Sequence, residues 1–300
     1  MNWRYKSLLQ QAFSRIPYGE QLNYLCQRWV TKSLPKDDAQ FLKWAQEAKV
    51  HIDVIVKHWG RSIETAVFYE FGAGWDLLGP MTFWALGAEQ QIVIDKRRLF
   101  RSELINDVTE KFRRVPTGFP LRRKPTRGIK GGAQAVFSLA DNYGIDYRAP
   151  CDAGHTGLAS GSVDCITSTS TLEHIPVPNL RAILAECHRL LRDTGIASFS
   201  VDYDDHYSYF DSGISAWNFL RYSDRTWAPF NPPLQYQNRL RHRDYLEMIA
   251  AAGFAVIEER REKGTEADLE TLKRVPLARC FTRFSLEELA VHKSRLVLRK

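Results

Sequence analysis

The sequence predicts an α/β protein with a doubly wound, mostly parallel sheet. From residue 66 onward, short apolar runs rich in β-branched and aromatic residues alternate with stretches of helical periodicity, which is typical of a sheet covered on both faces. A glycine-rich turn, "FGAGWDLLG", follows the first run, where the backbone can approach a ligand closely. Carboxylates stand at the ends of three of the first four runs, at the sheet edge where ligands bind in such folds.

The first 62 residues are predicted to form a helical extension packed on this domain, because apolar residues recur at helical spacing over residues 8–16 and 41–54. For residues 6–17, a helix lying in a membrane interface stays open as an alternative. No apolar stretch is long enough to cross a bilayer, and the N-terminus lacks the apolar core of a signal peptide. The five scattered cysteines form no C-x-x-C pair, which favours a reducing, cytoplasmic location and disfavours disulfides and structural zinc.

The remaining chain, residues 63–300, is expected to form one domain. Strands are predicted at residues 66–72, 91–95, 145–152, 163–170, 196–203, 254–260 and 294–299. Helices are predicted between them at residues 81–88, 98–112, 179–195 and 243–253. Gly87 and Gly195 are expected to end two of these helices, and Asp76 is expected to cap a helix that begins near residues 77–80.

Two connections in this domain are unusual. Residues 111–131 contain proline and glycine, and the part up to Lys130 carries eight Lys or Arg and no acid, so this segment is predicted to be a basic loop. Residues 203–240 are too long for an ordinary connection and are predicted to be a lid or substrate-side insertion. The many aromatic residues of this insertion either pack a small core of their own or line an acceptor pocket.

The glycine-rich turn does not match the commonest phosphate-binding motifs. Leu77 stands where a dinucleotide fingerprint needs its third glycine, and the Gly-Lys-Ser/Thr of a P-loop is absent. Asp95, 21 residues after Gly74, ends the second strand, where a carboxylate can accept both hydroxyls of a ribose. The acid Glu70 beside the turn suits a cationic ligand. These features together favour an adenosine that bears a positive charge.

Five segments, in order, resemble the class I S-adenosylmethionine-dependent methyltransferases over roughly residues 66–300. Glu70, Gly72 and Gly74 match the family's first motif, and Asp95 matches the acid that ends its second strand. The further matching segments are "CDA" at residues 151–153, "SGSVDCITSTSTLEHIPVPNLRAILAECHRLLRDTG", "LRHRDYLEMIAAAGFAVIEER" and the last strand "KSRLVLR". The resemblance implies a seven-stranded, Rossmann-like sheet, S-adenosylmethionine as cofactor, and a bacterial enzyme with an N-terminal helical extension. The sequence departs from the first motif at Asp76.

The same resemblance implies how the cofactor is held. Gly72 and Gly74 would let the backbone approach it, and Asp95 would bind its ribose. For Glu70, two alternatives stay open: contact with the ligand, or orientation of the turn through backbone hydrogen bonds.

Three further residues complete the implied cofactor site. Asp152 would accept a hydrogen bond from the adenine amino group, while the Ala153 N–H would donate to the adenine ring. The Ser168 carbonyl, at the end of the fourth strand, would accept from the methionine ammonium.

Two histidines are candidates for proton transfer, because a histidine with a free pKa of about 6.5 can take up a proton near neutral pH. His174 either fixes the loop that leads into the next helix or acts as base on a substrate hydroxyl or amine. His206, in the insertion, is an alternative base. It stands beside Asp204 and Asp205, but three adjacent side chains cannot all converge on one ion, so no metal site is predicted.

These features predict an enzyme that transfers a methyl group from S-adenosylmethionine to an oxygen or nitrogen of a small-molecule or glycan-type acceptor and releases S-adenosylhomocysteine. The net charge of +7 and the pI of about 9.1 leave a less favoured alternative, an RNA methyltransferase that uses the basic residues 111–130. A non-catalytic scaffold of the same fold is a second alternative. An oxidoreductase is disfavoured by Leu77.

Overall fold

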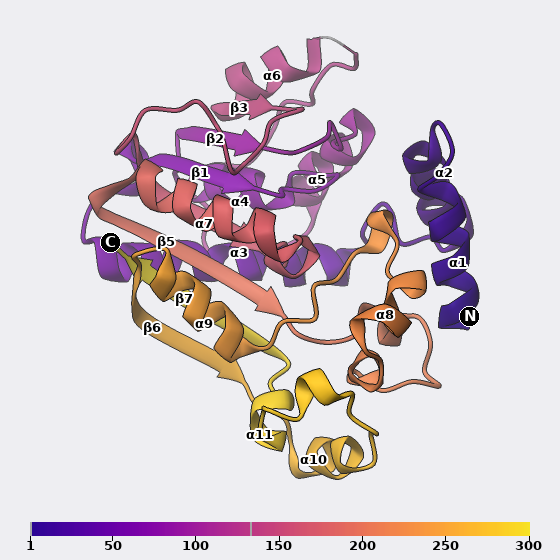
Figure 1. Cartoon of the computed structure of the whole chain (residues 1–300). Helices are drawn as coiled ribbons and strands as arrows, with labels where there is room; N and C mark the ends of the chain where they lie inside the picture. Colours follow the sequence, from indigo (N-terminus) through magenta and orange to yellow (C-terminus); the bar gives the residue numbers. More distant parts are fainter. Residues whose placement is uncertain (1, 133) are drawn as a thin grey trace.

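The computed structural model describes residues 2–132 and 134–300, and its central element is a seven-stranded sheet (Figure 1). The strands are β1 (Val67–Phe71), β2 (Gln90–Ile94), β3 (Ile145–Arg148), β4 (Val163–Thr169), β5 (Leu191–Asp202), β6 (Ala255–Glu262) and β7 (Lys293–Arg299). They follow the order β3-β2-β1-β4-β5-β7-β6. Strands β1 to β5 pair in parallel, and β7 runs antiparallel to β5 and β6. The predicted mostly parallel sheet is therefore confirmed.

Helices cover both faces of the sheet, as the alternation of strands and helices predicts (Figure 1). The helices packed on the sheet are α3 (Asp38–Trp59), α4 (Leu78–Leu86), α5 (Ser102–Arg114), α6 (Gln134–Tyr143), α7 (Val177–Leu190) and α9 (His242–Ala251). Helices α7 and α9 share a core with Tyr69 and Phe71 of β1. Helices α3 and α4 share another core with Phe68. Phe68 and Tyr69 belong to different cores because successive side chains of a strand point to opposite faces of the sheet.

The N-terminal segment consists of α1 (Trp3–Phe13), α2 (Gly19–Leu25), a π-helical turn at Cys26–Val30, and α3. A capping box starts α3: Gln40 N–H donates to the Asp37 side chain, and Asp37 N–H donates to the Gln40 side chain. Gly60, with φ of 69°, ends the helix. Ile55 of α3 is fully buried in the same cluster as residues of β1, β4 and β5. Helix α3 thus shares the core of the sheet, and the division between residues 1–62 and 63–300 stays a prediction.

Two insertions extend beyond the ends of β5 and β6. The first holds 3-10 turns at His206–Tyr209, Asn218–Arg221, Ala228–Phe230 and Pro233–Gln235, together with α8 (Asp224–Trp227). The second, for which the sequence analysis predicts no element, holds α10 (Glu266–Lys273), a 3-10 turn at Arg279–Phe281 and α11 (Leu286–Leu289). Aromatic side chains of both insertions form one buried cluster with Trp3 of α1; they are Tyr207, Trp217, Phe219, Trp227, Phe281 and Phe284. For these side chains, the alternative of a small packed core is the correct one.

The predicted end of one helix is wrong. Helix α7 ends at Leu190 rather than at Gly195, and β5 begins at Leu191, which pairs with Val163. Gly195 lies inside β5, where an added Cβ would come within 2.8 Å of the Asp164 carbonyl oxygen. The glycine therefore serves the close approach of two strands and does not end a helix.

The predicted basic loop 111–131 is a loop only from Val115 onward. Its first four residues complete α5, which ends ahead of Pro116 because the residue before a proline disfavours the helical conformation. Arg123 of this loop donates from Nε to the Trp84 carbonyl and from Nη2 to the Ala88 carbonyl, both at 2.9 Å. Part of the positive charge in this segment is thus used to fasten the loop to the domain.

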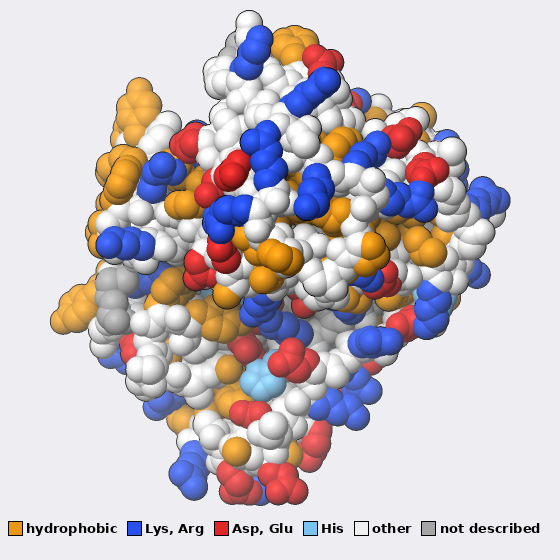
Figure 2. All heavy atoms as spheres, turned by 180° about the vertical axis from the view of Figure 1, so that it is seen from behind, with side chains coloured by type: hydrophobic (Ala, Val, Ile, Leu, Met, Phe, Trp, Pro, Cys, Tyr) orange, Lys and Arg blue, Asp and Glu red, His pale blue; other side chains and the backbone are white. Residues whose placement is uncertain are grey.

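The outer surface of the N-terminal segment is strongly apolar. Figure 2 shows large apolar side chains projecting along the left edge, where α1 and α2 lie. The exposed apolar residues there are Tyr5, Leu8, Leu9, Ile16, Tyr18, Leu22, Leu25, Trp29 and Val30. Within residues 2–132 and 134–300, no helix combines the length and apolarity that a membrane span requires. All five cysteines are free thiols.

Candidate functional site

The glycine-rich turn between β1 and α4 borders a cleft of about 210 Å³. The cleft is lined by Lys36, Trp44, Ala48, Glu70, Gly72, Ala73, Gly74, Trp75, Asp76, Leu78, Gly79, Thr169, Ser170 and Thr171. Gly72 and Gly74 both have the left-handed backbone that favours glycine, with φ of 78° and 77°. An added Cβ at Gly72 would come within 2.3 Å of the Thr171 side chain, whereas at Gly74 it would meet no atom within 4 Å. Gly72 therefore serves packing, and Gly74 leaves open space in front of the backbone.

Asp76 closes the turn at the start of α4. Its Oδ1 accepts from the Leu78 N–H, the first N–H of α4, at 3.2 Å. The predicted contact is therefore made, but from the residue before the N-cap, which is Leu77, with φ of 50° and no side-chain cap bond. Oδ2 of Asp76 forms an ion pair with Lys36, which precedes α3. Lys36 and Trp44 are not among the residues predicted for the site, because a contact between segments so far apart in the chain leaves no local pattern.

Asp95 follows β2 directly and is buried. The Tyr147 hydroxyl donates to Asp95 Oδ2 at 2.8 Å, and the Cys151 N–H donates to the Asp95 carbonyl at 2.9 Å. Burial raises the pKa of the Asp95 carboxyl to about 7, while the hydrogen bond from Tyr147 acts in the opposite direction. Asp95 is not among the residues that line the cleft described above.

Glu70 lies on β1 with its carboxyl buried behind the turn. Its Oε1 is 3.3 Å from where a Cβ would stand on Gly79, in the first turn of α4. Burial, together with the nearby charge of Asp95, raises the pKa of Glu70 to about 8. Within the described residues, Oε2 has no hydrogen-bond partner. A buried carboxyl oxygen without a partner at the wall of a cleft can receive a donor from a ligand.

The other three predicted cofactor residues lie apart from the cleft. Asp152 is in the loop after β3, its side chain is 63% exposed, and its Oδ1 accepts from the Gly154 N–H at 2.9 Å. Ala153, beside it, is half-buried and packs against the core beneath α7. Ser168 is fully buried and its Oγ donates to the Phe71 carbonyl at 3.3 Å. It is the penultimate residue of β4, and the residues that follow it line the cleft instead.

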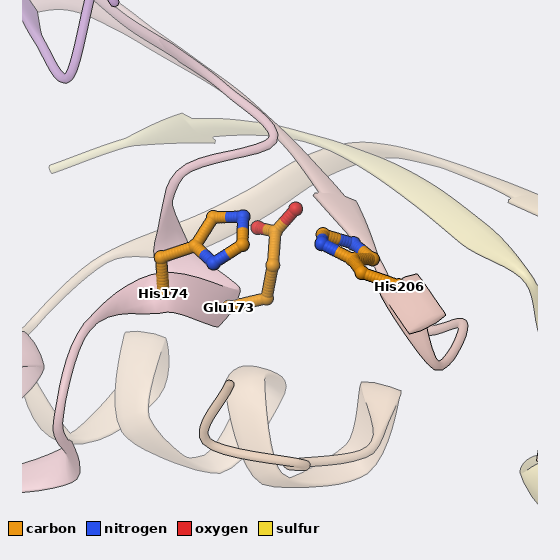
Figure 3. A group of neighbouring side chains, drawn as sticks. All are labelled: Glu173, His174 and His206. Carbon is orange, nitrogen blue, oxygen red and sulfur yellow. The ribbon is translucent and has the colours of Figure 1, made fainter. Parts of the chain in front are cut away.

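The two candidate catalytic histidines lie together, with their ring centres 4.8 Å apart. His174 belongs to a 3-10 turn after β4 (Leu172–His174), and His206 begins the turn after β5. Figure 3 shows the carboxyl group of Glu173 between the two imidazole rings. Burial lowers the pKa of His206 to about 3 and also lowers the pKa of His174, and it raises the pKa of Glu173 well above its usual range. Both imidazoles are therefore neutral at pH 7.

Hydrogen bonds fix part of this cluster. His174 Nδ1 lies 2.7 Å from the Tyr236 carbonyl oxygen, to which it donates, because a carbonyl can only accept. His174 thus makes the loop-fixing contact through Nδ1–H, which leaves the lone pair of the ring on Nε2. His206 Nε2 is 3.9 Å from Asp202 Oδ2, and that oxygen accepts from the Tyr209 hydroxyl at 2.7 Å.

The acids next to His206 point elsewhere, as the sequence analysis expects for adjacent residues. Asp204 pairs with His292, with 2.7 Å between Oδ1 and Nδ1. Asp205 Oδ2 accepts from the Asn218 side chain at 3.0 Å. The partner that local reasoning missed is Glu173, which comes from a different loop.

Residues 134–199 match the family model described as a methyltransferase domain. Among solved structures, the chain is similar to the 1,6-didemethyltoxoflavin-N1-methyltransferase of Burkholderia thailandensis with bound 1,6-didemethyltoxoflavin and S-adenosylhomocysteine. The identity is 15% and the TM-score 0.48, over 99% of this chain and 88% of that chain. It is similar to an S-adenosylmethionine-dependent methyltransferase of Mesorhizobium loti at 12% identity and a TM-score of 0.44, over 82% and 95% of the two chains.

The chain is also similar to a geranyl diphosphate methyltransferase in complex with GPP and sinefungin. The identity is 13% and the TM-score 0.46, over 84% of this chain and 77% of that chain. No curated protein matches the chain.

Proposed function

We propose that this chain is a class I S-adenosylmethionine-dependent methyltransferase and that it transfers the methyl group of its cofactor to an oxygen or nitrogen of a small-molecule or glycan-type acceptor. The observation that supports this most directly is the open turn at Gly74, in a cleft that the buried Glu70 also lines. Lys36, which lines the same cleft, is already paired with Asp76. Such a turn suits a positively charged nucleoside better than a pyrophosphate.

In this proposal, each predicted cofactor residue keeps a distinct role. The Asp95 carboxylate accepts the ribose hydroxyls, and Glu70 receives a donor from the methionine part. Asp152 and Ala153 contact the adenine. Their loop is joined to the end of β2 by the hydrogen bond from the Cys151 N–H to the Asp95 carbonyl, which supports a position beside the ribose. The Ser168 carbonyl accepts from the methionine ammonium.

Methyl transfer is an in-line displacement at the methyl carbon of the sulfonium. The acceptor atom forms a bond to that carbon while the carbon–sulfur bond breaks, and its electron pair goes to sulfur, which gives S-adenosylhomocysteine. The main contribution of the protein is to hold donor and acceptor roughly 3–3.5 Å apart and in line. Exclusion of water from the site adds to this effect.

We place the acceptor at the carboxyl ends of β4 and β5, near His174 and His206. The insertion 203–240 contributes His206 and the Tyr209 hydroxyl to that region, which supports its role as the substrate-side element. Both imidazoles are neutral at pH 7 and can act on an acceptor hydroxyl or amine. These two histidines are therefore the residues to which we assign activation of the acceptor.

Calorimetric titration with S-adenosylmethionine tests the proposal. The unaltered chain should bind one equivalent, and Asp95→Ala should weaken binding at least tenfold, since it removes a charged acceptor worth about 1.5–3 kcal/mol. Asp146→Ala is the matched control, because Asp146 lies on the neighbouring strand β3 and pairs with Arg148 on the surface. A chain that binds no cofactor would be the non-catalytic scaffold.

RNA methylation by means of residues 111–130 is the alternative acceptor class. Salt-dependent RNA binding that disappears when Lys124, Arg127 and Lys130 are neutralised together would support it. Arg123 is left intact in this test, because it holds the loop to α4.

A further inference from the structure

A group of three metal-ligating side chains lies at the ends of two adjacent strands. Glu173 and His174 follow β4, His206 follows β5, and one ligand atom from each lies within 4.8 Å of the other two. An ion with tetrahedral bonds of about 2.1 Å holds its ligand atoms about 3.4 Å apart. Rotation of the side chains toward a common centre would therefore bring the three atoms to bonding distance.

The buried atoms of this group lack the partners that buried polar atoms normally have. Within residues 2–132 and 134–300, three of these atoms have no hydrogen-bond partner: both carboxyl oxygens of Glu173, and Nε2 of His206. Glu173 is only 3% exposed and His206 8%. Several buried polar atoms without partners that face one another in this way indicate a shared ligand.

His174 is oriented as a metal ligand would be. Its Nδ1–H donates to the Tyr236 carbonyl at 2.7 Å, so the proton is on Nδ1 and the lone pair is on Nε2. A backbone carbonyl that fixes the tautomer and the ring direction is a frequent companion of metal-binding histidines. Figure 3 shows both rings directed at the Glu173 carboxyl group rather than away from it.

We propose that Glu173, His174 and His206 bind a divalent transition-metal ion of the Zn²⁺, Mn²⁺ or Fe²⁺ class. Two imidazoles and one carboxylate suit such ions and not Mg²⁺ or Ca²⁺, which favour oxygen ligands. Asp202, 3.9 Å from His206 Nε2, supplies a further negative charge, and it is shared with Lys293 at 3.7 Å. Three protein ligands leave a coordination position open.

This inference deepens the proposed function and rests on it for the identity of the reaction. The open position would take an acceptor hydroxyl, so the acceptor class becomes a hydroxyl-bearing small molecule that can chelate a metal. Coordination lowers the pKa of that hydroxyl, which loses its proton to water. The oxygen then bonds to the methyl carbon, the carbon–sulfur bond breaks, and sulfur keeps the electron pair. The two histidines act on the acceptor through the ion.

Metal binding can be measured directly on the full chain after removal of metal with a chelator. We expect titration with Co²⁺ or Zn²⁺ to give one equivalent, with visible d–d absorption for Co²⁺. Glu173→Gln and His206→Ala should each weaken binding by at least tenfold. His58→Ala is the matched control, because His58 also pairs with one carboxylate, Glu258, and should retain binding.

The outcomes of this experiment are separable. No binding of Co²⁺ or Zn²⁺ by the unaltered chain, or binding that His174→Ala, His206→Ala and Glu173→Gln all leave unchanged, overturns the metal site. If His206→Ala unfolds, the unaltered chain and the milder Glu173→Gln still decide the question. S-adenosylmethionine binding measured in excess chelator tests the proposed function separately, because none of the three ligands belongs to the cofactor side.

Discussion

The hydroxyl of Tyr147 donates a 2.8 Å hydrogen bond to Oδ2 of Asp95, at the point where β2 and β3 end side by side. The bond engages one oxygen of the carboxyl group and fixes the direction of the other. It also opposes the effect of burial on the pKa of Asp95. The neighbouring strand therefore influences how strongly Asp95 can accept hydrogen bonds from a ribose.

Cofactor affinity should depend on pH for this reason. Burial raises the pKa of Asp95 to about 7 in the free chain, and the ribose hydroxyls need the ionised form. The affinity for S-adenosylmethionine should therefore fall as the pH drops below 7 and Asp95 takes up a proton, by up to about tenfold per pH unit. Calorimetry across this range measures the slope. In Asp95→Asn the slope should shrink, and equal affinities above and below pH 7 in the unaltered chain would contradict the assignment.

The two glycines of the turn should respond differently to alanine. Both substitutions impose left-handed strain of about 1–2 kcal/mol. Gly72→Ala should destabilise the fold further, because its Cβ would overlap the Thr171 side chain, which lies 2.3 Å away. Gly74→Ala meets no atom, so it should cost only the strain but weaken cofactor binding about tenfold or more. Chemical denaturation and calorimetry on the two variants make the comparison, and equal effects of both on binding would remove the distinction.

Asp76 should matter more for stability than for binding. Asp76→Gly removes the acceptor for the Leu78 N–H and the partner of Lys36, which together are worth about 1–3 kcal/mol. The change in cofactor affinity should be the smaller of the two effects. Lys36→Met, which removes only the ion pair, should destabilise less than Asp76→Gly. A large loss of affinity at nearly unchanged stability would place Asp76 among the cofactor contacts.

A buried histidine predicts loss of stability in mild acid. His51 of α3 is fully buried, with Nδ1 2.8 Å from Ser198 Oγ and Nε2 3.2 Å from Thr169 Oγ1. Burial lowers its pKa to about 3, so the folded chain binds fewer protons than the unfolded chain, in which the pKa is about 6.5. The stabilisation is complete above about pH 6.5 and decreases as the pH falls toward 3, by about 1.4 kcal/mol per pH unit.

Denaturation curves of the unaltered chain and of His51→Gln at several pH values isolate the contribution of His51 to the pH dependence of stability. The unaltered chain should lose about 2 kcal/mol more than the variant between about pH 6.5 and 5. Other buried histidines contribute equally to both proteins and cancel in the difference. Parallel stability curves would show that His51 does not titrate as its burial implies.

The strands and the glycine turn were predictable because each has a local cause. A short apolar run can be predicted to be a strand when it is buried on both faces. An acid directly after such a run indicates the end of the strand, as at Asp95. The end of α7 could not be predicted, because a glycine often follows the end of a helix, whereas Gly195 is required by the contact between β4 and β5. The pairing of chain segments decides such cases, and it leaves no mark in a short window of sequence.

The same limit applies to the candidate site. Glu173 and His174 stand in one segment and His206 in another, and only the parallel register of β4 and β5 brings them together. The ion pair of Lys36 with Asp76 likewise joins an N-terminal segment to the turn. The chemistry of a single residue can therefore be predicted from the sequence, whereas its partners, which come from distant segments, cannot.

The position of Trp3 has a consequence for synthesis on the ribosome. Its ring lies 5.7 Å from Trp227 and 5.0 Å from Phe230, in a cluster that Leu289 completes. In a nascent chain, Trp3 therefore meets all of its cluster partners only after residue 289 has been translated, whereas β1 to β5 all lie within residues 67–202. The cofactor side would mature before the acceptor side, and a bulky fusion ahead of Trp3 would disturb acceptor use while sparing cofactor capture.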